Sequence, residues 1–169
     1  IPALAKVNLG VTSPLMVNAM LALSVIGIMV GAYVSARKSV NSVKVNNIYT
    51  GSTTITVCAI LVPVVATLSF IPNSTALIIV STLILLFGVG AGMMLVPLNA
   101  LIQAHSAKDG LGSVLAGKNW IQNMAMIGLL LLTVLLARSN VNSVYILYLN
   151  ALIAVVGFTV VLRRLKAIL

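Results

Sequence analysis

Five long apolar runs constrain the fold of this 169-residue chain more than any other feature. The hydrocarbon core of a bilayer is about 30 Å thick, so a helix needs about 20 apolar residues to cross it. The runs are too long for membrane β-strands, and they do not alternate apolar with polar residues. The sequence therefore predicts an all-α polytopic membrane protein, a bundle of about five transmembrane helices. The predicted spans cover approximately residues 13–36, 49–71, 75–104, 111–137 and 143–162.

The composition supports a membrane protein and argues against a nucleic-acid-binding one. Hydrophobic residues make up 61% of the chain and charged residues only 7%, whereas soluble domains carry about 25% charged residues. The net charge of +9 could indicate a nucleic-acid partner. However, the Lys and Arg residues lie mainly at the ends of the apolar runs, as the positive-inside rule describes. The expected partner is therefore the lipid bilayer, and no nucleic acid is expected.

The distribution of these cations predicts an orientation. One side of the membrane would carry seven of them, namely Arg37, Lys38, Lys44, Lys108, Arg163, Arg164 and Lys166. The other side would carry Lys6 and Arg138, and Lys118 would lie within a span. The positive-inside rule makes the richer side, with the C-terminus, cytoplasmic. Five spans then place the N-terminus outside, so we expect missing N-terminal helices of the same protein, with residues 1–169 as its C-terminal transmembrane bundle.

Polar side chains gather on one side of the fourth predicted span. They are Lys118, Asn119, Gln122 and Asn123, which cover an arc of about 140° on a helix. Polar groups are costly in hydrocarbon, so this arc should face protein or a water-filled cavity. Lys118 could instead extend its side chain to the membrane interface. Its three polar neighbours favour a charge that faces a cavity.

The third predicted span has a comparable polar face. On an ideal helix, four residues lie within about 60°, namely Gly88, Gly92, Asn99 and Gln103. The glycines would open space beside the two amides. Alternatively, the amides would only join neighbouring helices through hydrogen bonds. The GxxxG spacing recurs between Gly27 and Gly31, where close helix packing is the favoured interpretation.

The remaining polar and reactive residues give little support to catalysis or metal binding. Cys58 is the single cysteine and is expected to be a small buried residue, so neither a disulfide within the chain nor a metal or other cofactor is expected. His105 and Asp109 could form a catalytic pair, but a solvated turn is favoured. No enzymatic activity is expected. Three threonines near one end of the second span are expected to bond to their own helix, namely Thr50, Thr53 and Thr54.

A specific stretch of the sequence resembles a known family. Residues 96–103 read Val-Pro-Leu-Asn-Ala-Leu-Ile-Gln, and a short basic turn with glycine, then Asn119 and Asn123, follow. This pattern resembles the bacterial lysophospholipid transporter family of the major facilitator superfamily. The similarity extends across nearly the whole chain, including Asn18-Ala19-Met20 and residues 27–32, and would cover the last five of twelve helices.

The resemblance implies a function and a set of site residues. Members of the family move lysophospholipids, chiefly lysophosphatidylethanolamine, inward across the inner membrane of Gram-negative bacteria, and an acyltransferase then rebuilds the diacyl lipid. The implied mechanism is alternating access around a polar site. The family positions that match in this chain are Asn99, Gln103, Asn119 and Asn123.

The chain departs from the family pattern at two positions of the fourth span. The family has Gln-Asn, two residues, then Glu-Asn, whereas Lys118 and Gln122 stand here for the Gln and the Glu. Each change adds one positive charge, which suggests a net-anionic lysolipid such as lysophosphatidylglycerol. The predicted substrate-binding residues are therefore Asn99, Gln103, Lys118, Asn119, Gln122 and Asn123. The alternatives are a transporter of another small solute and a non-transporting membrane subunit.

Overall fold

The computed structural model describes residues 13–38, 45–68, 72–106, 110–139 and 141–166, with the side chains of residues 38, 45 and 164–166 excepted. These residues form five helices, α2 (Pro14–Lys38), α3 (Val45–Thr67), α4 (Asn73–His105), α5 (Leu111–Arg138) and α6 (Ser143–Lys166). All five are long and apolar enough to cross a membrane. The prediction of an all-α, multi-pass membrane protein is confirmed. The largest shifts in a boundary are four residues: α3 begins and ends four residues before the predicted span, and α6 ends four residues after it.

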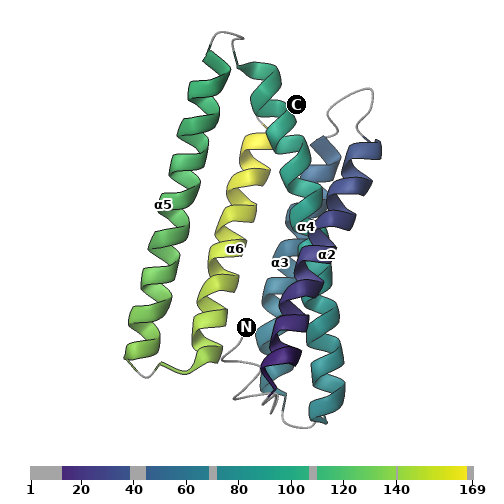
Figure 1. The fold of residues 1–169 in the computed structure, drawn as a ribbon, viewed down its shortest axis with the longest axis vertical. Helices are drawn as coiled ribbons and strands as arrows, with labels where there is room; N and C mark the ends of the chain where they lie inside the picture. The colour runs from purple at the N-terminus through teal and green to yellow at the C-terminus, as the bar shows by residue number, and fades with distance from the viewer. Residues whose placement is uncertain (1–12, 39–44, 69–71, 107–109, 140, 167–169) are drawn as a thin grey trace.

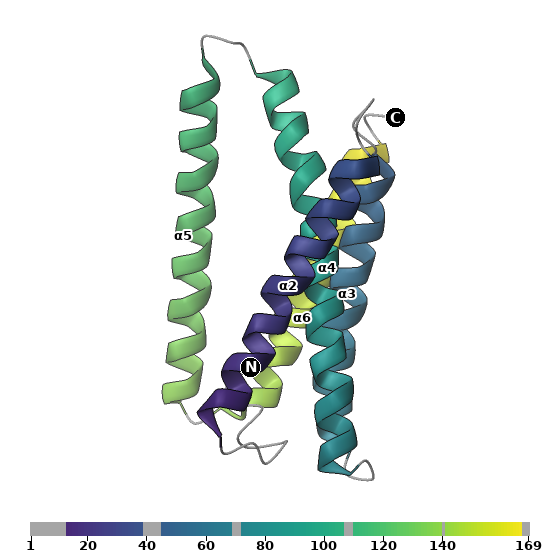
Figure 2. The same cartoon turned by 45° about the vertical axis from the view of Figure 1, so that its right-hand side comes forward.

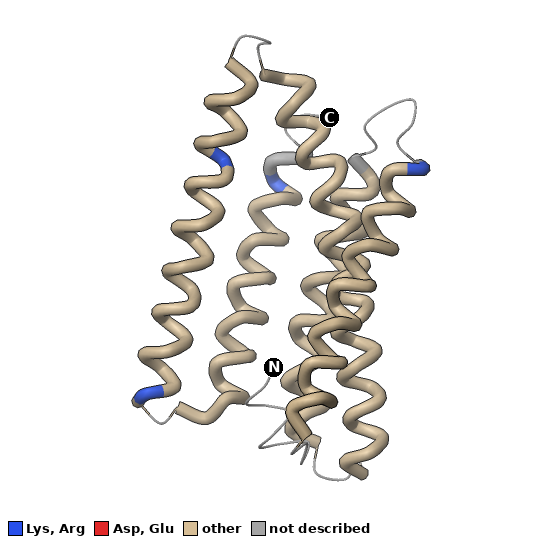
Figure 3. The backbone as a smooth tube through the Cα atoms, viewed as in Figure 1, with Lys and Arg blue, Asp and Glu red and all other residues tan. Residues whose placement is uncertain are grey.

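The helices run up and down, so successive helices are antiparallel (Figure 1). Helices α2 and α3 pack against α4, and α6 packs against α3. The C-terminal ends of α2, α4 and α6 therefore lie at one end of the bundle, which we call the basic end. Arg37 and Arg163 lie in the last turns of α2 and α6 at this end, whereas Arg138 ends α5 at the opposite end (Figure 3). Lys6, Lys44 and Lys108 lie outside the described residues.

Glycine allows the backbones of α2 and α4 to touch. A Cβ atom added at Gly27 or Gly31 would collide with the carbonyl oxygen of Leu85 or Val89 on α4. Added at Gly88 or Gly92, it would collide with the carbonyl oxygen of Ser24 or Ile28 on α2. The packing interpretation of the GxxxG spacing is thus confirmed. The expectation that Gly88 and Gly92 open space beside the amides is wrong, because the backbone of α2 fills that space.

Helix α4 also meets α3 through glycine. A Cβ atom added at Gly51 would lie 2.6 Å from the carbonyl oxygen of Gly90, and one added at Gly90 would lie 2.9 Å from that of Gly51. Closer to the start of α4, Ala76, Val80 and Ile84 form a buried apolar cluster with Met20 of α2. Helix α4 is therefore the central element, fixed on one face to α2 and on another to α3.

Helix α5 stands beside this packed unit (Figure 2). None of its residues is buried. Its half-buried residues lie on a single side, and they are Leu111, Leu115, Lys118 and Leu136. On a helix these four positions fall within an arc of about 60°. This arc identifies the side of α5 that faces the other helices.

Candidate functional site

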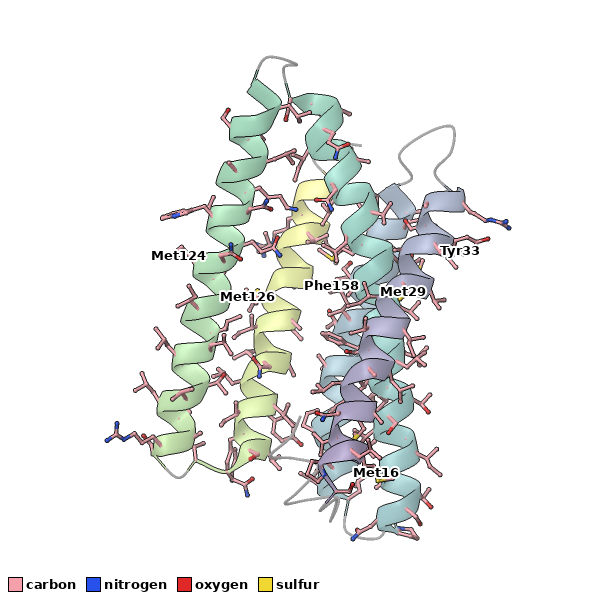
Figure 4. The ribbon with its side chains drawn as sticks, viewed as in Figure 1. Met16, Met29, Tyr33, Met124, Met126 and Phe158 are labelled. Atoms are coloured by element: carbon pink, nitrogen blue, oxygen red, sulfur yellow. The ribbon has the colours of Figure 1, made fainter. Side chains whose placement is uncertain are left out.

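The polar arc of α5 overlaps the side that faces the bundle. Lys118 is half-buried and Gln122 lies about 40° from it around the helix axis. On the other side, Trp120 and Leu131 are 66% and 59% exposed. In Figure 4, Met124 projects away from the bundle, whereas Met126 projects toward α6. The prediction that polar and apolar residues divide α5 into two sides is therefore confirmed for Lys118 and Trp120.

One polar contact joins α5 to α4 directly. The Nζ atom of Lys118 donates a hydrogen bond of 2.7 Å to Oδ1 of Asn99. Both side chains are half-buried. The ammonium group is thus directed toward α4. Two of the six predicted site residues, which come from different spans, are brought together as the sequence predicted.

The structure does not bring the other four predicted residues into the same contact. Gln103 lies one turn beyond Asn99 on α4, and Asn119, Gln122 and Asn123 lie on α5. All four side chains are exposed. Within the described parts of the chain, none of them makes a hydrogen bond to another protein group. Their role in binding stays a prediction.

The contact leaves Lys118 able to bind an anion. A lysine ammonium group has three N–H donors, and Asn99 accepts from one of them. The amide of Asn99 is neutral, and the only acidic residue of the chain, Asp109, lies outside the described residues. No described carboxylate therefore neutralises the charge of Lys118. A compact cation with free donors suits a phosphate or another anionic oxygen group.

A buried polar chain next to this site was missed by the sequence reasoning. The side chains of Ser35 and Asn47 are 0% and 5% exposed. Asn47 Nδ2 donates to Ser35 Oγ at 3.2 Å, and Ser35 Oγ donates to the carbonyl oxygen of Met93 at 3.3 Å. A signal was present, because Pro97 has no N–H for the carbonyl four residues before it. The sequence indicated an acceptor at Met93 but not which helix supplies the donor.

Three threonines of α3 form hydrogen bonds within their own helix. The hydroxyl groups of Thr50, Thr53 and Thr54 all donate to carbonyl oxygens three or four residues earlier in their own helix. This confirms the expectation that they bond locally. Cys58 is free and buried, as predicted. Among the described residues, no group of three or more His, Cys, Asp or Glu side chains could hold a metal ion.

His105 lies at the end of α4 and is exposed. Its Nδ1 atom is 3.0 Å from the carbonyl oxygen of Leu101 in the same helix. The proposed partner in a catalytic pair, Asp109, lies outside the described residues. His105 is therefore an exposed residue at a helix end, with a hydrogen bond to its own helix.

Replacing His105 with alanine is expected to change the free energy of unfolding by less than about 0.5 kcal/mol, as is usual for exposed positions. Thermal unfolding of the purified protein in detergent would measure this. The activity of the protein should also stay within about twofold of the parent. A loss of about a hundredfold, typical when a general acid or base is removed, would contradict this prediction and restore the catalytic interpretation.

The candidate site is therefore a charged contact between two membrane-crossing helices, with four exposed amide side chains nearby in the sequence. It can bind an anionic group at Lys118, and it contains no described nucleophile or acid–base pair. No protein-family model, curated protein or solved structure matches this chain.

Proposed function

We propose that this protein is a membrane transporter that moves lysophospholipids across the bacterial inner membrane by alternating access. The observation that carries the proposal is the hydrogen bond between Lys118 Nζ and Asn99 Oδ1. It places a cation and an amide between two spans, where polar groups are costly and therefore tend to mark functional sites. The resemblance of residues 96–103, Asn119 and Asn123 to lysophospholipid transporters supplies the substrate class. The proposal includes no enzymatic step.

In this proposal, the lipid headgroup binds at the polar site and the acyl chain stays in an apolar environment. The lysolipid phosphate would accept hydrogen bonds from the two N–H groups of Lys118 that Asn99 does not use. The amides of Asn99, Gln103, Asn119, Gln122 and Asn123 would bind the remaining polar groups. The single acyl chain would lie against the exposed apolar side chains of α5 or in the surrounding lipid.

The mechanism requires movement around the site, and the packing of α5 supports such movement. None of the residues of α5 is buried, so its displacement would disrupt little apolar packing within the described bundle. Segments with few buried contacts open at low cost. Helices α2, α3 and α4, held together by glycine contacts, would form the more rigid unit. Displacement of α5 would separate Lys118 from Asn99 and so change the affinity for the headgroup.

We also propose the orientation predicted by the positive-inside rule. Arg37 and Arg163 lie at the basic end and Arg138 at the other. The basic end, with the C-terminus, would be cytoplasmic. Fusing a reporter whose activity depends on the compartment to the C-terminus would test this. A periplasmic signal would contradict the orientation.

A headgroup competition tests the role of Lys118. Lys118→Gln should lower uptake of lysophosphatidylglycerol relative to lysophosphatidylethanolamine by about tenfold, because the lost positive charge offsets the net negative charge of the first lipid, whereas the second carries its own ammonium group. Uptake of both lipids into vesicles that contain the full protein would measure the ratio. Arg138→Gln is the matched control, because it removes the same charge from an exposed position at the far end of α5.

The outcomes separate the alternatives. An unchanged headgroup ratio in Lys118→Gln would contradict the role of Lys118 in headgroup binding. Absence of any protein-dependent lysolipid uptake would contradict the proposed function. Uptake of a soluble solute in its place would support a transporter of another small solute. If replacement of Asn99 and Asn119 impaired assembly without affecting flux, a non-transporting subunit would be supported.

A further inference from the structure

The buried polar chain formed by Asn47, Ser35 and the carbonyl group of Met93 connects three helices. Asn47 lies near the start of α3, Ser35 lies near the end of α2, and Met93 lies in α4. Both side chains are almost fully buried. A buried polar group without a hydrogen-bond partner is costly in a membrane, so we ask which group these hydrogen bonds satisfy.

Pro97 leaves the carbonyl group of Met93 without its usual donor. A helical carbonyl group normally accepts a hydrogen bond from the N–H group four residues later, and for Met93 that residue is Pro97, which has none. Ser35 supplies the missing donor from α2. Asn47 donates to the Ser35 oxygen, so the single hydroxyl proton of Ser35 is left to point at Met93. The two hydrogen bonds therefore run in one direction, from a donor on α3 through Ser35 on α2 to an acceptor on α4.

These hydrogen bonds lie about one turn before Pro97 of α4. Before this place, Gly90 and Gly92 hold α4 against the backbones of α3 and α2. The last part of α4 then leans away from α2 toward α5 (Figure 2). Pro97, which is fully buried, is the only proline inside α4. A proline inside a helix is the usual cause of such a bend.

Asn99 lies two residues beyond Pro97, on the part of α4 that leans toward α5, where it accepts the hydrogen bond from Lys118. A small change in the bend displaces every residue after it. A carbonyl group without a donor at Met93 would favour other bend angles, in which water or another group reaches it.

We propose that Ser35 and Asn47 are positioning residues, which hold the bend of α4 at the angle that places Asn99 within hydrogen-bond distance of Lys118. This inference rests on the proposed function for its consequence in transport. The bend itself can be measured without any substrate. The two parts are therefore tested separately.

The test of the bend uses distances between spin labels in the intact protein, with Cys58 replaced by alanine. One pair joins Val57 on α3 to Ala104 near the end of α4, and a reference pair joins Val57 to Leu86, before the bend. All three positions are exposed. Ser35→Ala should shift or broaden the distance distribution of the first pair and leave the reference pair unchanged. Ser24→Ala is the matched control, since the Ser24 hydroxyl donates to Leu21 in its own helix and should leave both pairs unchanged.

A second substitution separates positioning from a general loss of packing. Pro97→Ala restores the N–H group that Met93 lacks, so Ser35→Ala should then have little further effect on the first pair. Asn47→Leu, which removes the donor to Ser35, should reproduce the effect of Ser35→Ala when Pro97 is present and lose it when Pro97 is replaced. An effect of Ser35→Ala that is equally large in both backgrounds, or equally large for Ser24→Ala, would overturn the inference.

The transport measurement gives an independent result. Ser35→Ala should lower lysolipid flux by about threefold to tenfold, as expected for one buried hydrogen bond in a membrane, while Ser24→Ala should not. Unchanged flux together with a changed bend would overturn the claim that the bend serves the site. If the parent protein moved no lysolipid, the proposed function would fail, and the distance measurements would still decide whether Ser35 and Asn47 fix the bend.

Discussion

Gly31→Ala is expected to lower the free energy of unfolding by about 2 kcal/mol or more, in the upper part of the range for overpacked positions. The added Cβ atom would collide with the carbonyl oxygen of Val89. It would also lie only 2.8 Å from the carbonyl carbon and 2.9 Å from the Cα atom of Val89. These neighbours are backbone atoms, so no side-chain rotation relieves the collision. Helices α2 and α4 would have to move apart, which disrupts the most closely packed contact of the bundle.

Unfolding of the purified protein in detergent or bicelles would measure this loss. Gly157→Ala on α6 is the matched control, because a Cβ atom there would meet nothing within 4 Å. The control should be neutral or stabilise the protein by up to about 1 kcal/mol, since alanine favours a helix over glycine. Equal stability of the two variants would contradict the close contact between α2 and α4.

Asn99→Leu is expected to reduce lysolipid flux by at least about tenfold. The substitution removes the acceptor of the Lys118 hydrogen bond and one amide of the proposed headgroup site. It should also lower the free energy of unfolding by about 1 to 3 kcal/mol, because a half-buried ammonium group is left without its partner. Flux into vesicles and unfolding in detergent would measure the two effects.

The double variant Asn99→Leu/Lys118→Met separates binding from stability. Replacing both partners with apolar groups should recover most of the lost stability, since no polar group is left unpaired. Flux should remain low, because the headgroup site is still absent. Asn150→Leu on α6, an exposed asparagine outside the proposed site, is the control for the change in residue type. Recovery of flux in the double variant would contradict a binding role for Asn99 and Lys118.

Ideal helix geometry separated Lys118 from Trp120 on α5, but it did not predict which neighbour each part of α4 meets. On α5, angles counted from Lys118 correctly separated the half-buried side from the side that carries Trp120. On α4, the same counting placed Gly88 and Gly92 on the face of Asn99. In the structure, the glycines touch α2 while Asn99 bonds to α5. Positions on one face of a helix can meet different neighbours, because packed helices cross at an angle and diverge along their length.

The buried pair Ser35 and Asn47 illustrates a second limit. Serine and asparagine near helix ends are common, and nothing in their spacing distinguishes these two from Ser24 or Asn150. Their role depends on a carbonyl group in another helix, 58 residues from Ser35 along the chain. The sequence shows that Pro97 lacks an N–H group, but which donor replaces it depends on how α2, α3 and α4 cross.

The sequence by itself determined the five membrane-crossing helices, the placement of Lys118 and Trp120 on opposite sides of α5, and the close packing at Gly27 and Gly31. Each of these follows from local composition, because the length of the hydrocarbon core, the helical repeat and the size of glycine act within one segment. Only the tertiary structure decided that α2 fills the space beside Gly88 and Gly92 and that Ser35 donates to the Met93 carbonyl group. It also decided that, among the predicted site residues, Asn99 is the one that accepts the hydrogen bond of Lys118. These contacts join residues from different helices, and the faces that helices present to one another are set by the packing of the whole bundle.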